Sequence, residues 1–333
     1  MAGNTATRTY TIKKRKIPKV GEIVNYTPDT PSTGYDLSTA KSGYSSAQTI
    51  DGTYDPTTWK IMEVDENGNI TKLLGIGAKT AYFKGSTGYN NGVYLLNDIC
   101  KSRYGNASLG ATARSLTIED IESRMNATGI AARNAYKGYN NNSIQYGTTR
   151  KHTGSYTKYP AIYAQEKYSG INVSDVADGT QVITGSVNTT AQSKMNPNGK
   201  SGSDDIYTTL PEKSETTGPS KTNLTCTQTY YDFDSTPSSY FDDTNFHSMI
   251  FGTGTSFWLA SRYVNCNSSD SSADFGLRGV TRGSLDGFGL FNSYDYSGGS
   301  GYGLRLASVV SLGFGIQVKS GSGTESDPYV IGK

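Results

Sequence analysis

Apolar and polar residues alternate in short runs along much of the chain, and this alternation predicts strands more often than helices. Residues 59–64 and 70–76 are two such runs, and between them residues 65–69 (Asp-Glu-Asn-Gly-Asn) are typical of a turn. An Asn-Gly pair between two alternating runs is typical of a β-hairpin. Further strands are predicted at residues 224–230, 257–262 and 306–312.

A period of 3.6 residues is found in two places and predicts two helices. Between residues 91 and 104, Val93, Leu96 and Ile99 fall on one helical face. The second helix begins after Thr117, which can cap it, with Asp120 three residues later.

The first turn of that second helix is acidic, with Glu119, Asp120 and Glu122. These carboxylates are candidate catalytic acids. Helix capping and the helix dipole account for them without any reaction, and we prefer that interpretation.

The periodic runs divide the chain unevenly. Residues 1–56 form an irregular β-rich arm and lead-in, and residues 57–333 are expected to form one domain. Residues 127–222 are rich in Asn, Tyr, Ser, Thr and Gly and show weak periodicity. A structureless loop of that length is not expected inside a compact domain, so we predict either an insertion with its own short strands or a surface excursion.

Composition favours an ordered, loop-rich protein. Of the 333 residues, 34% are hydrophobic and 18% are charged, yet the chain has 25 Tyr and 10 Phe. Disordered chains are usually rich in charge and poor in aromatics. The net charge of +2 argues against nucleic acid as the main partner. The basic run at residues 13–16 follows an alternating stretch at residues 9–12, and we interpret it as an arm that docks on a neighbouring subunit of a homo-oligomer.

Several classes of chemistry lack a sequence signal. Cys100, Cys226 and Cys266 are scattered and form no CxxC metal motif, and His152 and His247 have no nucleophile motif nearby. No apolar run approaches the roughly 18 residues that span a bilayer, and no apolar signal core follows the N-terminal charges. We therefore expect a non-enzymatic protein without cofactor or membrane insertion. An alternative metal site could use the acidic residues Asp232, Asp234, Asp242 and Asp243, but they lack EF-hand-like spacing and we prefer a solvated acidic loop.

The C-terminal third carries the strongest functional signal. About two thirds of residues 263–303 are Ser, Gly, Asn, Asp or Tyr, a composition typical of antibody and designed paratopes. Tyr offers broad contact area at a small entropy cost, and the small polar residues form adaptable hydrogen bonds. Apolar residues such as Leu277, Val280 and Leu290 interrupt the segment at intervals and predict a frame beneath a polar, aromatic face.

Residues 258–262 (Trp-Leu-Ala-Ser-Arg), 274–278 (Asp-Phe-Gly-Leu-Arg) and 303–305 (Gly-Leu-Arg) resemble the variable proteins of diversity-generating retroelements, as found in gut Firmicutes and their phages. Residues 88–100, 113–122 and 321–331 extend the resemblance. It implies an α+β, C-type-lectin-like fold with two helices and a curved antiparallel sheet. It also implies a hypervariable ligand face at about residues 258–312, recoded by a reverse transcriptase that makes errors at adenines.

By this resemblance, the variable, ligand-binding positions are Tyr263, Asn265, Asn267, Asp270, Asp274, Gly276, Gly279, Arg282, Asp286, Phe288, Tyr294, Asp295 and Tyr296. The frame residues are Trp258, Arg262, Leu277, Arg278, Leu304 and Arg305. The triplets of calcium-dependent sugar-binding lectins are missing, so that activity is not supported.

The resemblance implies a function in host attachment. Phage members of the family bind host receptors, and this sequence lacks the export or pilin-like N-termini of some relatives. We therefore expect a tail or capsid-surface protein of a phage virion, made in the host cytoplasm, that contacts virion structural proteins and binds a bacterial cell-surface protein or glycan. The alternatives are a bacterial cell-surface location, a structural decoration or filament subunit that assembles through the N-terminal arm, and an enzyme on the same fold, which would need a metal at a cysteine pair.

Overall fold

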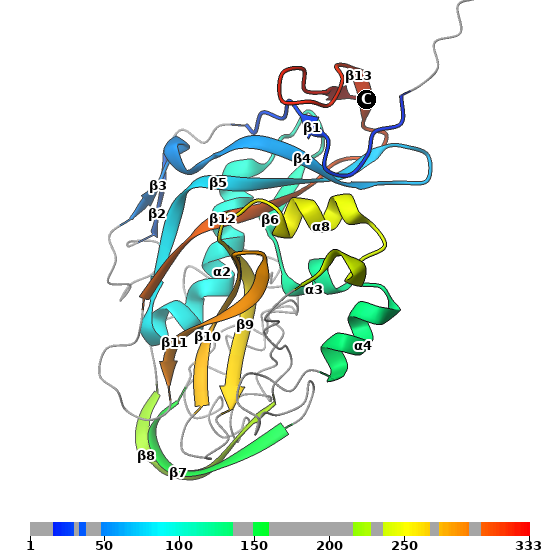
Figure 1. Cartoon of the computed structure of the whole chain (residues 1–333). Coiled ribbons are helices and arrows are strands. Elements are labelled where there is room, and N and C mark those ends of the chain that lie inside the picture. Colours follow the sequence, from blue (N-terminus) through cyan, green and yellow to red (C-terminus); the bar gives the residue numbers. More distant parts are fainter. Residues whose placement is uncertain are drawn as a thin grey trace, which may run out of the picture.

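The computed structural model describes residues 16–29, 33–37, 48–135, 149–159, 216–227, 236–266, 273–292 and 301–333. These residues form a mixed α+β structure around a mostly antiparallel, eight-stranded sheet (Figure 1). The strand order is β1-β4-β5-β12-β9-β10-β11, and β6 also pairs with β12. The strands of this sheet are β1 (Ile23–Val24), β4 (Pro56–Val64), β5 (Ile70–Lys84), β6 (Thr112–Ser115), β9 (Phe257–Cys266), β10 (Ala273–Thr281), β11 (Ser284–Asn292) and β12 (Gly301–Ser311).

The predicted hairpin is confirmed in β4 and β5. Asp65 organises its turn, because its Oδ1 accepts the backbone amides of Asn67 at 2.9 Å and Asn69 at 2.7 Å. Gly68 has a φ of 73°, a conformation that glycine adopts without strain. Local turn chemistry thus sets the register of the two longest neighbouring strands on this side of the sheet.

The helices are more numerous than the two predicted. In the described residues they are α2 (Gly85–Tyr104), α3 (Ile118–Glu122), α4 (Ala127–Ala135) and α8 (Thr244–Phe251), with 3-10 turns η1 (Gly52–Tyr54) and η3 (Ser238–Tyr240). Helix α2 begins at Gly85 and not at residue 91. Its first turns show little apolar periodicity because Gly88 and Gly92 face the sheet there, close to Leu290 and Leu277.

The predicted start of α3 is confirmed. The Thr117 hydroxyl accepts the backbone amide of Asp120 at 3.4 Å, and Asp120 Oδ2 accepts the amide of Thr117 at 2.9 Å. Arg114 also holds Asp120 in an ion pair of 2.6 Å. These contacts make Asp120 a capping residue, and its pKa stays below the usual value because hydrogen bonds from Arg114 and Thr117 outweigh its burial.

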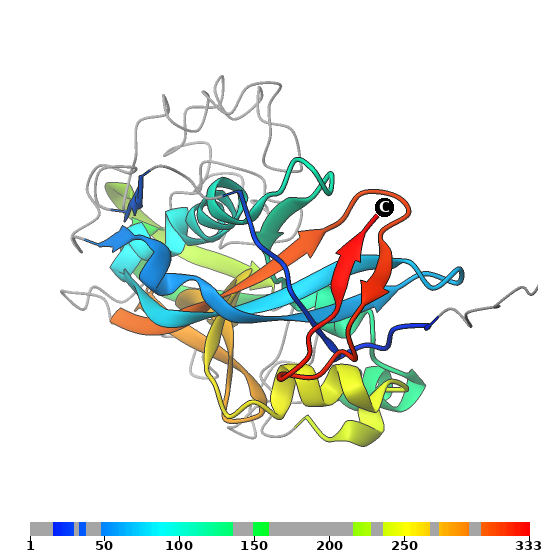
Figure 2. The ribbon, with the colours of Figure 1, turned by 90° about the horizontal axis from the view of Figure 1, so that it is seen from above.

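Both faces of the sheet are covered, which explains why its central strands are apolar on both sides. Alternate residues of β12 enter different hydrophobic clusters, Val309 with α3 and α8 and Val310 with the C-terminal end of α2. Figure 2 shows α2 and α8 on opposite sides of the strand layer. Helix α8 was not predicted from the sequence, and it buries Phe246, Met249 and Ile250.

The remaining elements lie outside the main sheet. Strands β7 (Thr149–Tyr159) and β8 (Thr216–Thr227) pair with each other, and β8 extends beyond residue 222, the predicted end of the insertion. Two further two-stranded pairs are β2 (Tyr35–Asp36) with β3 (Thr49–Ile50), and β13 (Gln317–Ser320) with β14 (Val330–Gly332). The basic run expected at residues 13–16 lies outside the described residues except for Lys16.

Candidate ligand-binding face

Strands β9, β10 and β11 form a three-stranded lobe that separates from the rest of the sheet. Strand β12 pairs with β9 at one position only, Arg305 with Phe257, and the strands then diverge (Figure 1). Trp258 lies at this divergence with its side chain fully buried. Its Nε1 donates to the carbonyl oxygen of Ala81 on β5 at 2.8 Å, so Trp258 joins the lobe to the main sheet.

The strand register brings two polar segments to the same end of this lobe. Cys266 pairs with Ala273, and Asp274 pairs with both Asn265 and Asn292. The strand ends that precede residues 267–272, between β9 and β10, and residues 293–300, between β11 and β12, therefore lie close together. We call these the two anchored segments; both lie outside the described residues. The β7–β8 pair lies near this end, where β8 contacts β9 (Figure 1).

Eight of the predicted ligand positions belong to this end or lead to it. Tyr263, Asn265 and Asp274 lie on the paired strands, with Tyr263 opposite Gly276. The other five lie in the two anchored segments, outside the described residues: Asn267, Asp270, Tyr294, Asp295 and Tyr296.

Phe288 belongs to a row of aromatic rings across the lobe. Its ring lies edge-on to Trp258, with centroids 5.3 Å apart, and to Tyr302, with centroids 5.2 Å apart. Trp258 in turn contacts the buried ring of Phe83 at 5.6 Å. Phe288 and Tyr302 keep part of their surface exposed, so they offer aromatic area whose geometry is fixed by buried neighbours.

Gly276 and Gly279 make this row possible, and the structure leaves no room for a side chain at either. A Cβ at Gly276 would lie 1.9 Å from the carbonyl oxygen of Phe288, and one at Gly279 would lie 2.8 Å from Cε2 of the same residue. Both glycines are buried. The expectation that these two positions carry interchangeable side chains is therefore corrected, because close strand approach requires glycine there.

Arg282 and Asp286 lie toward the opposite end of the lobe from the two anchored segments. Arg282 is exposed in the two-residue β10–β11 turn with a φ of 47°, followed by Gly283 at 85°. Asp286 pairs in register with Gly279, and its Oδ1 accepts the amide of Gly287 at 2.8 Å. The structure thus does not gather all predicted ligand residues at one place.

The predicted frame residues are mostly buried. Leu277 faces α2, where a Cβ at Gly92 would lie 2.4 Å from its Cδ1. Leu304 is buried, and Arg305 is half-buried with Nη1 3.4 Å from the carbonyl oxygen of Gly77. Arg262 lies on β9, opposite Leu277.

Arg278 of β10 belongs to a buried group of charges with Glu122 of α3 and Arg133 of α4. Its side chain is 1% exposed. Glu122 forms an ion pair with Arg133 at 2.7 Å, and burial raises the pKa of Glu122 to about 7 despite the opposing effect of Arg133 and Arg278. Glu119 raises it further by repulsion. The acids considered as catalytic candidates therefore divide into a capping residue, Asp120, and a buried ion-paired residue, Glu122.

No candidate metal site is found among the described residues. None of their His, Cys, Asp and Glu side chains form a group of three or more that could hold a metal ion. Asp243 caps α8 by accepting the amides of Asn245 and Phe246, and Asp232 and Asp234 lie outside the described residues. Burial raises the pKa of the Cys100 thiol to about 12.

No described helix has both the length and the apolar character to cross a bilayer.

Sequence reasoning missed one aromatic residue near this face. Tyr82 on β5 is 36% exposed, and its hydroxyl lies 2.0 Å from where a Cβ of Gly301 would stand. It therefore lies over the start of β12, where residues 293–300 rejoin the sheet. The alternation of Ala81, Tyr82 and Phe83, with the middle residue exposed, is the signal that could have identified it.

Comparisons of the chain with protein-family models, with curated proteins and with solved structures found no match.

Proposed function

We propose that this protein binds a bacterial cell-surface macromolecule through the end of the β9–β11 lobe from which residues 267–272 and 293–300 emerge. We further propose that it is a tail or capsid-surface component of a phage virion with a C-type-lectin-like fold. The observation that carries the proposal is the register of β9, β10 and β11, which brings together the strand ends that lead into two segments of Ser, Asn, Asp, Tyr and Gly.

The surroundings of these segments support a binding role. Residues 267–272 connect β9 and β10, which carry the buried residues Trp258 and Leu277. Residues 293–300 connect β11 and β12, which carry the buried residues Leu290 and Leu304. A rigid base reduces the entropy lost when a loop binds a ligand. Phe288, Tyr302 and Tyr82 add half-exposed aromatic surface nearby, and partly exposed aromatics are frequent in the centres of protein interfaces.

Cell binding tests the proposal. The labelled full chain is incubated with a panel of gut Firmicutes isolates, and bound fluorescence is measured by flow cytometry. Combined Tyr294→Ala and Tyr296→Ala substitutions should reduce binding at least about tenfold, because central tyrosines contribute strongly to interfaces. The melting temperature should stay nearly unchanged.

Phe314→Ala is the matched control, because Phe314 is 92% exposed between β12 and β13. Strand β13 lies far from the end of the lobe in Figure 1. The control substitution should leave cell binding intact. Binding that survives the double tyrosine substitution would place the ligand face elsewhere.

The retroelement part of the proposal has an independent test in the surrounding DNA. We expect a reverse-transcriptase gene nearby and a near-copy of the segment that encodes residues 258–312, differing at adenines. If neither is found, the proposal that a retroelement varies this segment is wrong. The proposal that the protein binds cells is tested separately by the cell-binding assay.

A further inference from the structure

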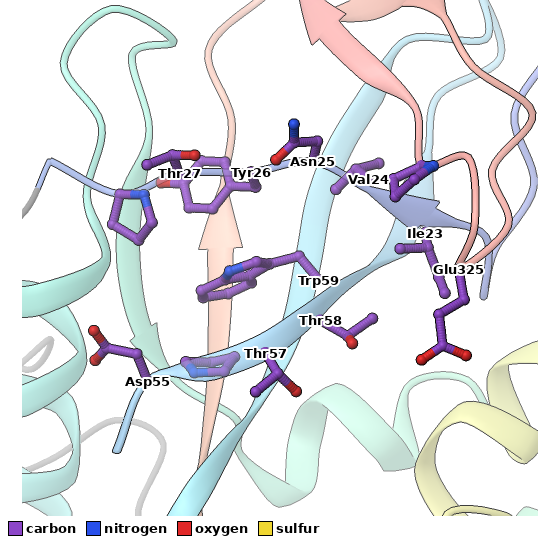
Figure 3. Close-up of a pocket in the computed structure, with 13 residues that line it drawn as sticks. Ile23, Val24, Asn25, Tyr26, Thr27, Asp55, Thr57, Thr58, Trp59 and Glu325 are labelled. Atoms are coloured by element: carbon purple, nitrogen blue, oxygen red, sulfur yellow. The ribbon is translucent and has the colours of Figure 1, made fainter. Parts of the chain in front are cut away.

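The N-terminal strand leaves an opening beside the main sheet. Strand β1 pairs with β4 at two positions only, Ile23 with Lys60 and Val24 with Trp59. The next amide, that of Asn25, donates to the carbonyl oxygen of Tyr329 at 2.8 Å, so the chain turns away from β4. The divergence opens a cavity of about 480 Å³ (Figure 3).

The walls of this cavity are preformed. One wall is the first half of β4, the other is the segment from Asn25 to Pro28, and Glu325 and Pro328 of the C-terminal loop stand at one end (Figure 3). Trp59 forms the floor. Its ring is held edge-on by Tyr26 at 5.0 Å and by Tyr104 at 5.6 Å.

Strand β4 presents an open edge to the cavity. Among the described strands, neither β1 nor β5 pairs with Thr57 or Thr58, because β1 pairs only with residues 59–60 and the β4–β5 register is interrupted between Pro56 and Trp59. An open edge can bind a further extended segment through backbone hydrogen bonds. The geometry therefore suits an extended polypeptide better than a compact small molecule.

Charge indicates which segment fits. The charged residues that line the cavity are both acidic, Asp55 and Glu325. Asp55 is paired with Arg103 at 2.8 Å, whereas the exposed Glu325 forms no ion pair with any described residue. A segment that combines strand-like alternation with positive charge complements both the open edge and Glu325.

The chain itself contains such a segment. Residues 9–12 (Thr-Tyr-Thr-Ile) alternate, and residues 13–16 (Lys-Lys-Arg-Lys) carry four positive charges. We propose that residues 9–15 of a second copy of this chain enter the cavity as an added strand, with residues 9–12 along β4 and Lys13, Lys14 and Arg15 beside Glu325.

The path of the chain favours a second copy over the chain's own arm. Residues 21 and 22 lie beside Ile61, through hydrogen bonds of 2.8 Å in each direction, and β1 lies beside residues 59–60. The chain thus approaches the cavity from the far side of β1, and Lys16 is held there by the carbonyl oxygen of Ser322 at 2.9 Å. To reach the cavity, the upstream residues of the same chain would have to turn back and cross β1. The same residues of a second copy do not have to cross β1.

Charge reversal tests the proposal on the full chain. Glu325→Lys should raise the dissociation constant for self-association roughly fivefold to tenfold, measured by analytical ultracentrifugation. Lys14→Glu should have a similar effect, and the combined variant should restore association. Glu66→Lys is the matched control, since Glu66 is also an exposed acid but lies in the distant β4–β5 turn. A chain whose association is absent, or is insensitive to Glu325→Lys, would overturn the proposal.

Cross-linking identifies the source of the arm. The variant with Thr11→Cys and Thr57→Cys should give covalent dimers or larger species on a non-reducing gel, and neither single variant should do so. A monomer with an internal disulfide would show that the arm binds its own chain and would overturn the assignment to a second copy. Neither result depends on cell binding, so this proposal can fail independently of the proposed function.

Discussion

The two ends of the β9–β11 lobe are made of the same three strands but have different surroundings. At the turn end, Val280 and Leu285 are buried in one hydrophobic cluster with Phe246 and Phe251 of α8. At the other end, the strands lead into residues 267–272 and 293–300, which contain no Val, Leu or Ile. The fold therefore depends on the apolar residues at the turn end, while the sequences at the other end contain no aliphatic residues that the core would require.

Under the proposed function, this difference separates the residues that stabilise the three-stranded lobe from those that bind the ligand. Substitutions in the packed middle and turn end should change unfolding more than binding, and substitutions in the two anchored segments should do the reverse. Each of the following predictions tests one side of that separation.

Trp258→Ala should have the largest effect, lowering the free energy of unfolding by about 3–5 kcal/mol. The side chain is fully buried, fills the divergence between β9 and β12, and donates a hydrogen bond to Ala81. Chemical denaturation measures the change. Trp258→Phe, which keeps a ring and loses the hydrogen bond, should lose less, and equal losses would mean that packing at the divergence contributes little.

Gly276→Ala should destabilise the protein by about 3 kcal/mol, the upper end of the range for overpacked sites. The added Cβ would stand 1.9 Å from a backbone oxygen of Phe288, and β11 would have to move. Gly303→Ala is the control in the same sheet, because the atom nearest to its Cβ would be Oγ1 of Thr80, at 3.4 Å. Similar unfolding midpoints for the two variants would return Gly276 to the set of exchangeable positions.

The parts of this fold that could be predicted from sequence are those set by local chemistry. The Asp65 turn and the Thr117 cap each depend on atoms within four residues, and both are present. Helix α8 was missed because its eight residues are too few to show a clear period, although Asp243 is a capping signal.

The candidate site was less predictable for a different reason. Composition cannot distinguish a glycine that is exchangeable from one that is wedged against another strand, and Gly276 is of the second kind. Likewise, the burial of Arg278 beside Glu122 depends on how α3 and α4 pack on β10, which no local pattern encodes.

Stability should also depend on pH through Glu122. Its pKa is raised in the folded state from 4.5 to about 7, so the folded protein binds this proton more tightly than the unfolded chain does. The contribution of this bound proton to the free energy of unfolding is fully present below pH 4.5 and is lost as the pH rises through 7. The shift corresponds to at most about 3 kcal/mol, and relaxation around Arg133 should reduce it to about 1–2 kcal/mol.

Glu122→Gln isolates this contribution from the other carboxyl groups. As the pH rises from 4.5 to 8, the free energy of unfolding of the variant should increase relative to that of the unsubstituted chain. Chemical denaturation at several pH values measures this difference. A difference in the free energy of unfolding that stays constant across that range would show that Glu122 is ionised throughout. The positive charges of Arg133 and Arg278 would then offset the burial of its carboxylate.

The smallest expected effect is at the β10–β11 turn, and it tests most directly whether the two ends of the lobe have different roles. Arg282 has a φ of 47° and precedes Gly283 at 85°, the backbone of a type I′ turn, in which Asn-Gly is preferred. Arg282→Asn should therefore stabilise the protein by about 0.5 kcal/mol, because asparagine tolerates the left-handed region better. Arg282→Ala should give no such gain.

Cell binding by the Arg282→Asn variant decides how far the ligand face extends. The turn lies against α8, where a Cβ at Gly283 would be 3.3 Å from the carbonyl oxygen of Phe251, at the end of the lobe away from residues 267–272 and 293–300. Binding should thus be unchanged while the unfolding midpoint rises. If binding falls together with that rise, a position that holds the turn also contacts the ligand, and recognition spans the whole hairpin and is not confined to one end.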